Sequence, residues 1–271
     1  MKNIFDVAYE CICEPDPVEK SKLTRMYAEQ WRSGGLEFVE SDSPVKPIDV
    51  PGRPEKPELV EPTSVAKRRV GGAEGLASLI HAIAHIEFNA INLAWDAVYR
   101  FREMPRDYYS DWIKVADEEA YHYTLLTDRL AELDYAYGDF TAHDGLWDMA
   151  RRTDHDVLVR MALVPRVMEA RGLDATPKIV SRLKSINDEA TIALLDIIMR
   201  DEIGHVAIGT RWFNYCCEQQ GLEPESTFKD LLFQYGKGKI RVPLHLSARR
   251  KAGFTESELD MLQTLAHSKD H

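Results

Sequence analysis

From Gly72 onward, apolar residues recur every three or four positions over long stretches of the chain. This spacing is typical of helices that bury one face against a core. It predicts a first helix over residues 73–101, a second over 106–135, a third that starts near 144 and a fourth that ends near 218. Strand patterns are almost absent, so the sequence predicts an all-α fold.

The segments on either side of this helical region have a different character. Residues 41–63 contain six prolines. No helix interior tolerates that density, so they predict an arm that lies extended along the body or is partly disordered. After residue 221 the pattern predicts shorter helices and a Gly-Lys-Gly-Lys loop over 236–239. Thr255 opens the last helix, with Glu258 three residues later, which is the spacing of a capping box. The predicted domains are an N-terminal helical segment with its arm, a helical bundle and a set of C-terminal helices, over 1–71, 72–220 and 221–271.

Two Glu-x-x-His pairs lie inside the predicted helices, and each follows a lone glutamate on an apolar helix face. The lone glutamate precedes its pair by 32 positions in the first set and by 33 in the second. A carboxylate buried alone is very costly, so it must be paired, protonated or bound to a metal. Glu and His three residues apart are neighbours on a helix and can reach one ion. The six candidate ligands are Glu87, Glu119, His122, Glu169, Glu202 and His205.

Turn signals support an antiparallel pairing of the helices that carry these residues. If each lone glutamate faces the glutamate of the Glu-x-x-His pair that follows it, the turns between the helices fall near positions 103 and 185. Pro105 follows the first position closely, and Asn187, a good turn or capping residue, follows the second. Four carboxylates and two imidazoles in this order are the ligand set of a dinuclear site inside a four-helix bundle.

This pairing of the glutamates also fixes how far the third predicted helix must extend. It must continue to about residue 185, although Gly172 and Pro177 would end a helix on local signals alone. We therefore predict a broken or kinked third helix, with Pro165 adding a further distortion.

An acidic residue stands directly before the glutamate of each pair: Glu118 in the first and Asp201 in the second. Such an acid can accept the free N–H of the opposite histidine, which fixes the tautomer of a ligating imidazole. A solvated surface acid is the alternative for both. Carboxylate and imidazole together favour iron, manganese or zinc over calcium or magnesium.

Three more polar residues lie near the predicted site. His81 and His85 are rotated by about 120° and 200° from Glu87 on an ideal helix. We therefore favour hydrogen-bonded histidines that pack on the arm or on the C-terminal helices, with a channel mouth or an outer ligand sphere as the alternative. Tyr121, beside His122, is a candidate redox tyrosine at the periphery of the site, and a core tyrosine is the alternative.

Net charge, apolar runs and cysteine spacing bear on the partners and the location of the protein. The net charge of -11, from 45 acidic and 34 basic residues, disfavours nucleic acid as a partner. No signal peptide and no run of roughly 20 apolar residues appears, so we expect no membrane span. The four cysteines lack disulfide or metal-finger spacing, which predicts reduced thiols and a cytoplasmic protein.

About half of the chain, from Gly72 to Glu218, resembles the ferritin-like di-iron carboxylate superfamily. It is most similar to an uncharacterised bacterial and plant branch, the domain-of-unknown-function family 455. The MEAR stretch and the Glu-x-x-His pairs are also similar to the tRNA-modifying di-iron hydroxylases. The resemblance implies a ferritin-like antiparallel four-helix bundle whose six ligands hold two metal ions. Iron is the first expectation, with manganese or a mixed iron–manganese pair as alternatives. The stretches that carry it are HAIAHIEFNAIN, DEEAYHYTLLTDRL, MEARGLDATP and RDEIGHVAIG.

This resemblance leads to three functional hypotheses. The first is an O₂-dependent di-iron oxidase or hydroxylase, which requires an unidentified small-molecule substrate and electron donor; the metal centre itself is catalytic, without a separate protein nucleophile. The second is a ferroxidase or a manganese centre that dismutates peroxide. The third is a non-enzymatic helical scaffold or a structural metal protein. The arm and the C-terminal extension argue against a ferritin shell and leave a homodimer open.

Overall fold

The chain is all-α in the computed structural model, which describes residues 1–39, 44–64, 72–236, 240 and 242–267. Within these residues, strand pairing is limited to two isolated bridges, Asn3 with Glu37 and Leu59 with Ala142. The predicted fold class is thereby confirmed at the level of helical content. The helical elements are α1 (Ile4–Cys13), α2 (Pro17–Arg32), α3 (Gly72–Arg100), α4 (Arg106–Glu132), α5 (Gly145–Arg152), α6 (Val157–Leu163), the π-helical η1 (Val164–Glu169), α7 (Ala170–Lys184), α8 (Glu189–Gln220), α9 (Pro224–Gly236), α10 (Leu246–Lys251) and α11 (Glu256–His267).

The chain forms two compact units, Met1–Arg152 and Thr153–His271. The boundary falls inside the predicted domain over 72–220. The division into arm, bundle and C-terminal helices therefore stays a prediction, and each unit is described by itself.

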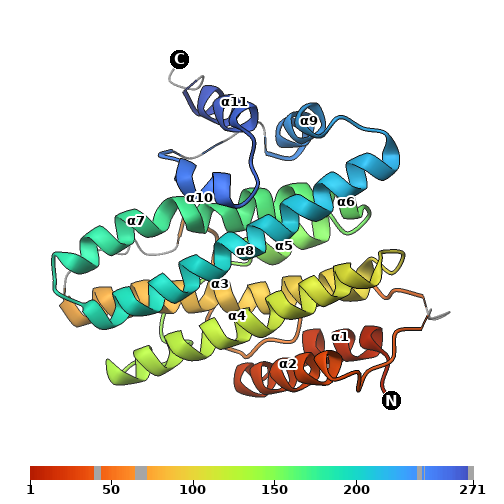
Figure 1. The fold of residues 1–271 in the computed structure, drawn as a ribbon. Coiled ribbons are helices and arrows are strands. Elements are labelled where there is room, and N and C mark those ends of the chain that lie inside the picture. The colour runs from red at the N-terminus through yellow and green to blue at the C-terminus, as the bar shows by residue number, and fades with distance from the viewer. Residues whose placement is uncertain (40–43, 65–71, 237–239, 241, 268–271) are drawn as a thin grey trace. The chain divides into compact units, whose positions relative to one another are not determined.

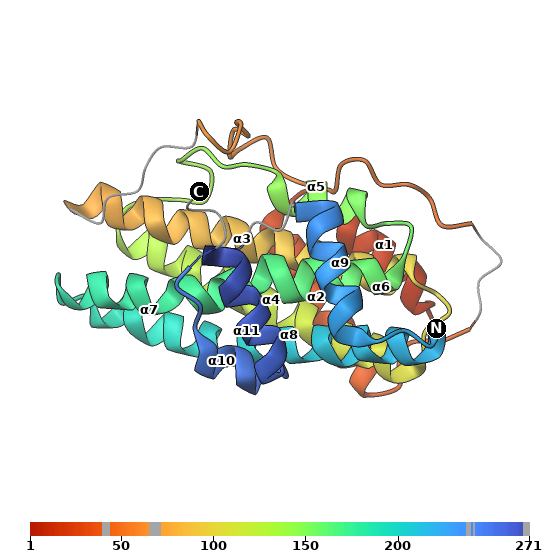
Figure 2. The same ribbon diagram turned by 90° about the horizontal axis from the view of Figure 1, so that it is seen from above.

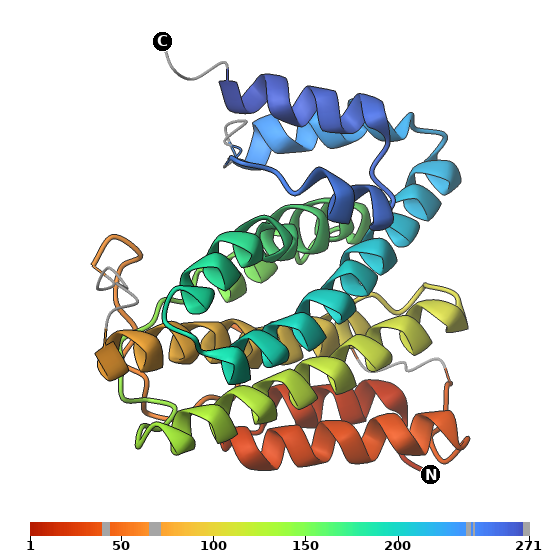
Figure 3. The same cartoon turned by 60° about the vertical axis from the view of Figure 1, so that its left-hand side comes forward.

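In the first unit, α3 and α4 are long antiparallel helices joined by a short turn (Figure 1). Pro105 is the N-cap of α4, so the turn lies where the sequence predicts it. Helices α1 and α2 pack as a pair against α3 and α4, and Figure 3 shows α2 alongside α4. Asp16 caps α2 by accepting hydrogen bonds from the backbone N–H groups of Val18 and Glu19.

Helix α3 is long and apolar enough to span a membrane by length and composition. However, 78% of its most apolar window is buried inside the protein. Burial of this extent is what the central helix of a packed unit shows, because a membrane span needs an apolar surface that faces lipid.

The Pro-rich segment 44–64 runs in an extended form along α3 (Figure 2). The backbone N–H of Lys46 donates to the Tyr99 hydroxyl at 2.8 Å, and the Trp147 indole donates to the carbonyl of Asp49 at 3.1 Å. These contacts hold the segment against α3 and α5. Hydrogen bonds from both neighbouring elements replace the regular pairing that the prolines prevent.

A lysine that the sequence analysis gave no role holds the arm to the helices. Lys20, on α2, is completely buried. Its Nζ donates to the carbonyls of Ile12 and Gly52, each at 2.9 Å, and to the side-chain oxygen of Asn92 on α3. Gly52 must be glycine here, because a Cβ would lie 2.2 Å from the carbonyl oxygen of Cys13. One ammonium group thus joins α1, α2, α3 and the arm.

In the second unit, α6, η1 and α7 form one interrupted helical segment that runs antiparallel to α8. The predicted interrupted helix is confirmed, and so is its turn, where Asn187 adopts a left-handed φ of 57°. Helix α7 continues through Gly172 and Pro177, as the ligand register requires, and the distortion predicted at Pro165 is the π-helical turn that contains this residue.

The C-terminal helices pack on this segment and on α8 (Figure 1): α9 contacts α6 and α8, and α10 contacts α7 and α8. Glu258 of α11 accepts a hydrogen bond from Arg166 of η1. The predicted capping box opens α11. The backbone N–H of Glu258 donates to the Thr255 hydroxyl at 3.1 Å, and the backbone N–H of Thr255 donates to the Glu258 carboxylate at 3.0 Å. The predicted loop over 236–239 lies, except for Gly236, outside the described residues.

All four cysteines are free thiols, as the sequence predicts. Burial raises the pKa of Cys11 and of Cys216 to about 12 and that of Cys217 to about 11. A thiol with such a pKa is a poor nucleophile and a poor metal ligand near neutral pH, because the reactive form is the thiolate.

Candidate metal centre

Three predicted ligands converge in the first unit. Nδ1 of His122 lies 3.1 Å from a carboxylate oxygen of Glu87 and 3.5 Å from one of Glu119. Each residue offers a ligand atom within 4.8 Å of the others. The three side chains are between 0% and 5% exposed. We call Glu87, Glu119 and His122 the first triad. It is a buried Glu/His group that could bind a metal ion.

The helices that carry the first triad place it by ordinary apolar packing. On α3, Ile80, Ala84, Ile91 and Ala94 lie on the face of Glu87 and are all buried. Because this face can only turn toward the core, it carries Glu87 inward with it. On α4, a spacing of three residues places the glutamate and histidine of the pair on one side of the helix.

The electrostatics of the first triad fit a bound cation. Burial, with the adjacent Glu119 carboxylate, raises the pKa of Glu87 to about 8 despite its contact with His122. Burial by itself lowers the pKa of His122, but hydrogen bonds to Glu119 and Glu87 outweigh it and raise that pKa to about 11. Without a metal, this buried cluster therefore retains protons at neutral pH. A divalent cation would replace them, as it does at carboxylate and imidazole ligands generally.

The second unit carries the other three predicted ligands. Nδ1 of His205 lies 3.3 Å from a carboxylate oxygen of Glu202, both on α8, and His205 is completely buried. Glu169 is the last residue of η1, which packs against α8, and it is 9% exposed. We call Glu169, Glu202 and His205 the second triad. Each unit thus contains one lone glutamate and one Glu-x-x-His pair.

The π-helical turn that ends at Glu169 contains a proline that packs closely against α8. A Cβ at Gly209 of α8 would lie 2.2 Å from Cγ of Pro165. Pro165 therefore packs directly on the α8 backbone, one turn beyond His205. Pro165 also lacks the N–H that a regular helix would use. Single π-helical turns often mark functional sites, and this one sets where Glu169 lies along the segment.

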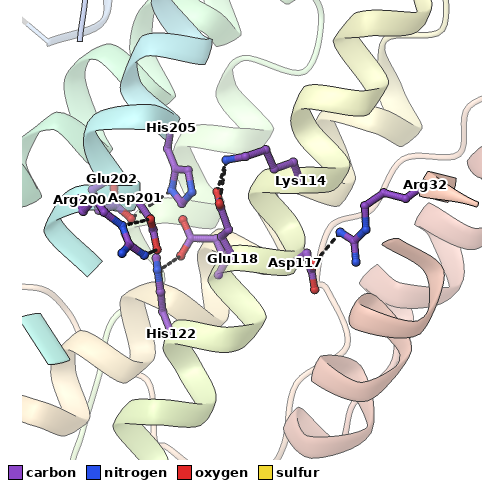
Figure 4. A network of polar contacts seen from close by, with 10 residues as sticks. Arg32, Lys114, Asp117, Glu118, His122, Arg200, Asp201, Glu202 and His205 are labelled. Carbon is purple, nitrogen blue, oxygen red and sulfur yellow. Dashed lines mark hydrogen bonds and ion pairs between the residues drawn. The ribbon is translucent and has the colours of Figure 1, made fainter. Parts of the chain in front are cut away.

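The two acids expected to support the histidines each have a partner in their own unit (Figure 4). Glu118 accepts hydrogen bonds from Lys114 at 2.6 and 2.7 Å. Asp201 accepts from Arg200 at 2.9 and 3.2 Å and is 13% exposed. Figure 4 also shows Asp117, next to Glu118, paired with Arg32 of α2. The support of a ligating histidine by Glu118 or Asp201 stays a prediction.

His81 and His85 are hydrogen-bonded residues of the first unit. His81 accepts from the backbone N–H of Gly138 at 2.9 Å and stacks on Tyr137. The ring nitrogens of His85 lie 2.9 Å from the Tyr137 hydroxyl and 3.1 Å from the carbonyl oxygen of His143. These hydrogen-bond partners belong to the connection between α4 and α5. His85 also lines a pocket with Pro51, Pro54 and Pro57 of the arm, which is one of its two expected neighbours.

Tyr121 lies next to the first triad, with its ring centroid 6.5 Å from that of His122. Its side chain is 37% exposed, and the guanidinium of Arg25 on α2 lies 5.5 Å from its ring centroid. This exposure contradicts the core interpretation, and the redox role stays a prediction. Tyr121 instead helps α4 to pack on α2.

Comparison with known proteins places the chain in a family. The family model described as "Protein of unknown function (DUF455)" matches residues 13–260. The chain belongs to this family. A Haemophilus influenzae relative, described as "Uncharacterized protein", is 48% identical over 216 residues, which cover 77% of this chain and 75% of the relative. No solved structure matches the chain significantly. Because neither the family nor this relative has a described function, a function for this DUF455 protein must be inferred from its two triads.

Proposed function

We propose that the two triads together bind one dinuclear metal centre inside a ferritin-like four-helix bundle. The bundle would consist of α3, α4, the α6–η1–α7 segment and α8. The observation that carries the proposal is the first triad, because two carboxylates and an imidazole buried so close together are costly without a cation. The second triad supports it, since the same residue types recur in the same order in the other unit.

In this proposal, Glu87, Glu119 and His122 bind one ion, and the second triad binds the other. Four carboxylates balance the charge of two divalent ions, and the neutral imidazoles complete the ligand set. Oxygen and nitrogen ligands of this kind suit iron, manganese or a mixed pair, and the resemblance to di-iron proteins favours iron. Glu118 and Asp201 would orient the two histidines.

The function we infer is an O₂-dependent oxidase or hydroxylase of a small molecule. A reduced di-iron centre supplies oxygen activation when it is bound. The protein's own residues hold the two ions and exclude water, because the first triad and the helix faces around it are buried. The reaction also needs an external electron donor. A cytoplasmic location, where the four free thiols stay reduced, belongs to the same proposal.

The test is metal content per chain, measured by plasma mass spectrometry on natively purified protein and after anaerobic reconstitution with Fe(II). We expect two irons per chain, and at most one in Glu119→Gln and in Glu202→Gln. Glu132→Gln, an exposed position on α4, should keep two. An optical change on mixing with O₂ would then justify a substrate screen.

Other outcomes of the same measurement contradict the proposal. Two manganese ions with catalase activity would assign the centre to peroxide dismutation. No metal under either condition would leave a helical scaffold. Two metals in both ligand variants would show that the ligand assignment is wrong.

A further inference from the structure

Glu169, the lone glutamate of the second triad, lies where the helix backbone is irregular. The N–H of Ala170 donates to the carbonyl of Pro165, five residues earlier, where a regular α-helix would use the residue four earlier. Such a π-helical turn holds one residue more than an α-helical turn would. Loss of that extra residue would rotate one side of the segment by about 100° against the other. The direction of the Glu169 side chain therefore depends on what holds the two sides.

The side that precedes Glu169 is held by α11. Arg166, three residues before Glu169, is buried, and one of its terminal N–H groups donates to the carboxylate of Glu258. The guanidinium carbon also lies 4.1 Å from the ring centroid of Phe228 and 4.7 Å from that of Phe254. Rotation of this turn would leave both charges of the pair buried without a partner, which is strongly unfavourable. The pair therefore fixes the rotation of the turn that carries Arg166.

The side that follows Glu169 is held by α10. Arg249, which is buried, donates from Nε and Nη2 to the two carboxylate oxygens of Asp174 at 3.0 and 2.6 Å. Its Nη2 also donates, at 3.5 Å, to the carbonyl of Ala170, the residue directly after Glu169. The backbone N–H of His245, the N-cap of α10, donates to Asp174 at 2.8 Å. A bidentate guanidinium–carboxylate pair fixes direction as well as distance, so the start of α7 cannot rotate either.

We propose that Arg249 and Glu258 are positioning residues for Glu169, and that the C-terminal helices serve to keep this carboxylate in the direction in which it binds its ion. The inference rests on the proposed function, because it takes Glu169 as a metal ligand. Attachment of the C-terminal helices alone would not need these pairs. Leu259 and Leu262 of α11 are already buried, and packed apolar residues in place of a buried ion pair are often neutral or stabilising.

The test is titration of the whole chain with Co(II), followed by visible absorption. This absorption depends on the number and geometry of the ligands, so it responds to the position of Glu169 rather than to the stability of the fold. We expect Arg249→Gln to bind one of its two Co(II) ions at least tenfold more weakly, with a spectrum that approaches that of Glu169→Gln. Arg249→Lys keeps the charge but loses the bidentate contact, and it should be intermediate.

Arg250→Gln is the matched control, because it removes a guanidinium from the same helix, where the side chain is 48% exposed and pairs with Glu256. It should bind both ions within twofold of the unmodified protein. Circular dichroism at the temperature of the titration checks folding, and if Arg249→Gln does not fold, Arg249→Lys decides. Equal Co(II) binding by the folded Arg249 variant and by Arg250→Gln overturns this inference and leaves the proposed function intact. Fewer than two Co(II) ions in the unmodified protein would contradict the proposed function and, with it, this inference.

Discussion

Each of the two units contains a buried cation that joins distant segments of the chain, Lys20 in the first and Arg166 in the second, and the two are held in different ways. In the first unit, Lys20 donates to neutral oxygens of Ile12, Gly52 and Asn92. In the second, Arg166 pairs with the Glu258 carboxylate and lies among three aromatic rings. Lys20 joins the arm to α3, which carries Glu87, and Arg166 joins α11 to η1, which carries Glu169.

The difference in partners determines whether each buried cation keeps its charge when the pH changes. Without a carboxylate partner, burial lowers the pKa of Lys20 to about 7, so its charge can be lost near neutral pH. Burial also lowers the pKa of Arg166. A guanidinium with an adjacent carboxylate nevertheless stays charged at any pH the protein meets. The stability of the first unit should therefore depend on pH, and the stability of the second should depend on the Glu258 carboxylate.

The largest effect is expected from Glu258→Gln, which removes the charge that compensates Arg166. Breaking a buried ion pair by removing one partner costs about 3–5 kcal/mol. We expect a loss of this size in the free energy of unfolding, measured with urea. Glu256→Gln, at an exposed position of α11, should change it by less than about 0.5 kcal/mol. A loss below about 1 kcal/mol in Glu258→Gln would show that the aromatic rings alone hold Arg166.

The next effect is a pH dependence that arises from Lys20. Its pKa is about 7 in the folded state and 10.5 when unfolded. Between these values the unfolded chain binds one more proton, so stability should rise with pH across this window and be independent of Lys20 below it. From pH 7 to 9 the gain is about 2–3 kcal/mol at one proton per chain.

Lys20→Met should remove this rise, and Lys22→Met, at an exposed position of the same helix, should retain it. The measurement is urea unfolding at several pH values. Identical pH profiles for Lys20→Met and the unmodified protein would mean that the three oxygen acceptors keep Lys20 charged.

A smaller effect should come from the contact between Pro165 and α8. In Gly209→Ala the new Cβ would overlap the proline ring, and overpacking of this kind costs about 1–3 kcal/mol. Gly204→Ala is the matched control on the same helix, since a Cβ there meets nothing within 4 Å. It should stabilise the protein by about 0.5–1 kcal/mol, because alanine favours a helix over glycine. Thermal unfolding that moves in the same direction for both variants would contradict the close packing at Pro165.

The smallest effect concerns the metal affinity of the first triad. The Glu87 carboxyl, with a pKa of about 8, must lose its proton before it can bind a cation. The Glu87 proton should therefore contribute at most about tenfold per unit to a rise of affinity between pH 6 and 8, and His122, which also holds a proton in this range, contributes separately. Competition titration with a chelator measures the slope, and Glu87→Gln should make it shallower. A slope in Glu87→Gln equal to that of the unmodified protein would place Glu87 outside the ligand set.

Much of the fold follows from local signals in the sequence. Apolar periodicity located α3, α4 and α8, and the capping box located the start of α11, because these features depend on residues within one or two turns. The spacing of the glutamates also placed the turn at Asn187 correctly, although Gly172 and Pro177 argued for an earlier end. Ligand register was a better guide than helix propensity, since packing of a whole helix outweighs one unfavourable residue.

For the candidate site, the sequence by itself determined which residue types recur and at what spacing, and the burial of Glu87, Glu119 and His122 agrees with it. Only the tertiary structure decided the rest. Lys20 and Asn92 are 72 residues apart, and Arg166 and Glu258 are 92 apart. Their burial depends on which segments pack together. No local pattern records that choice, because a lysine or arginine on a helix is solvated unless a distant segment covers it.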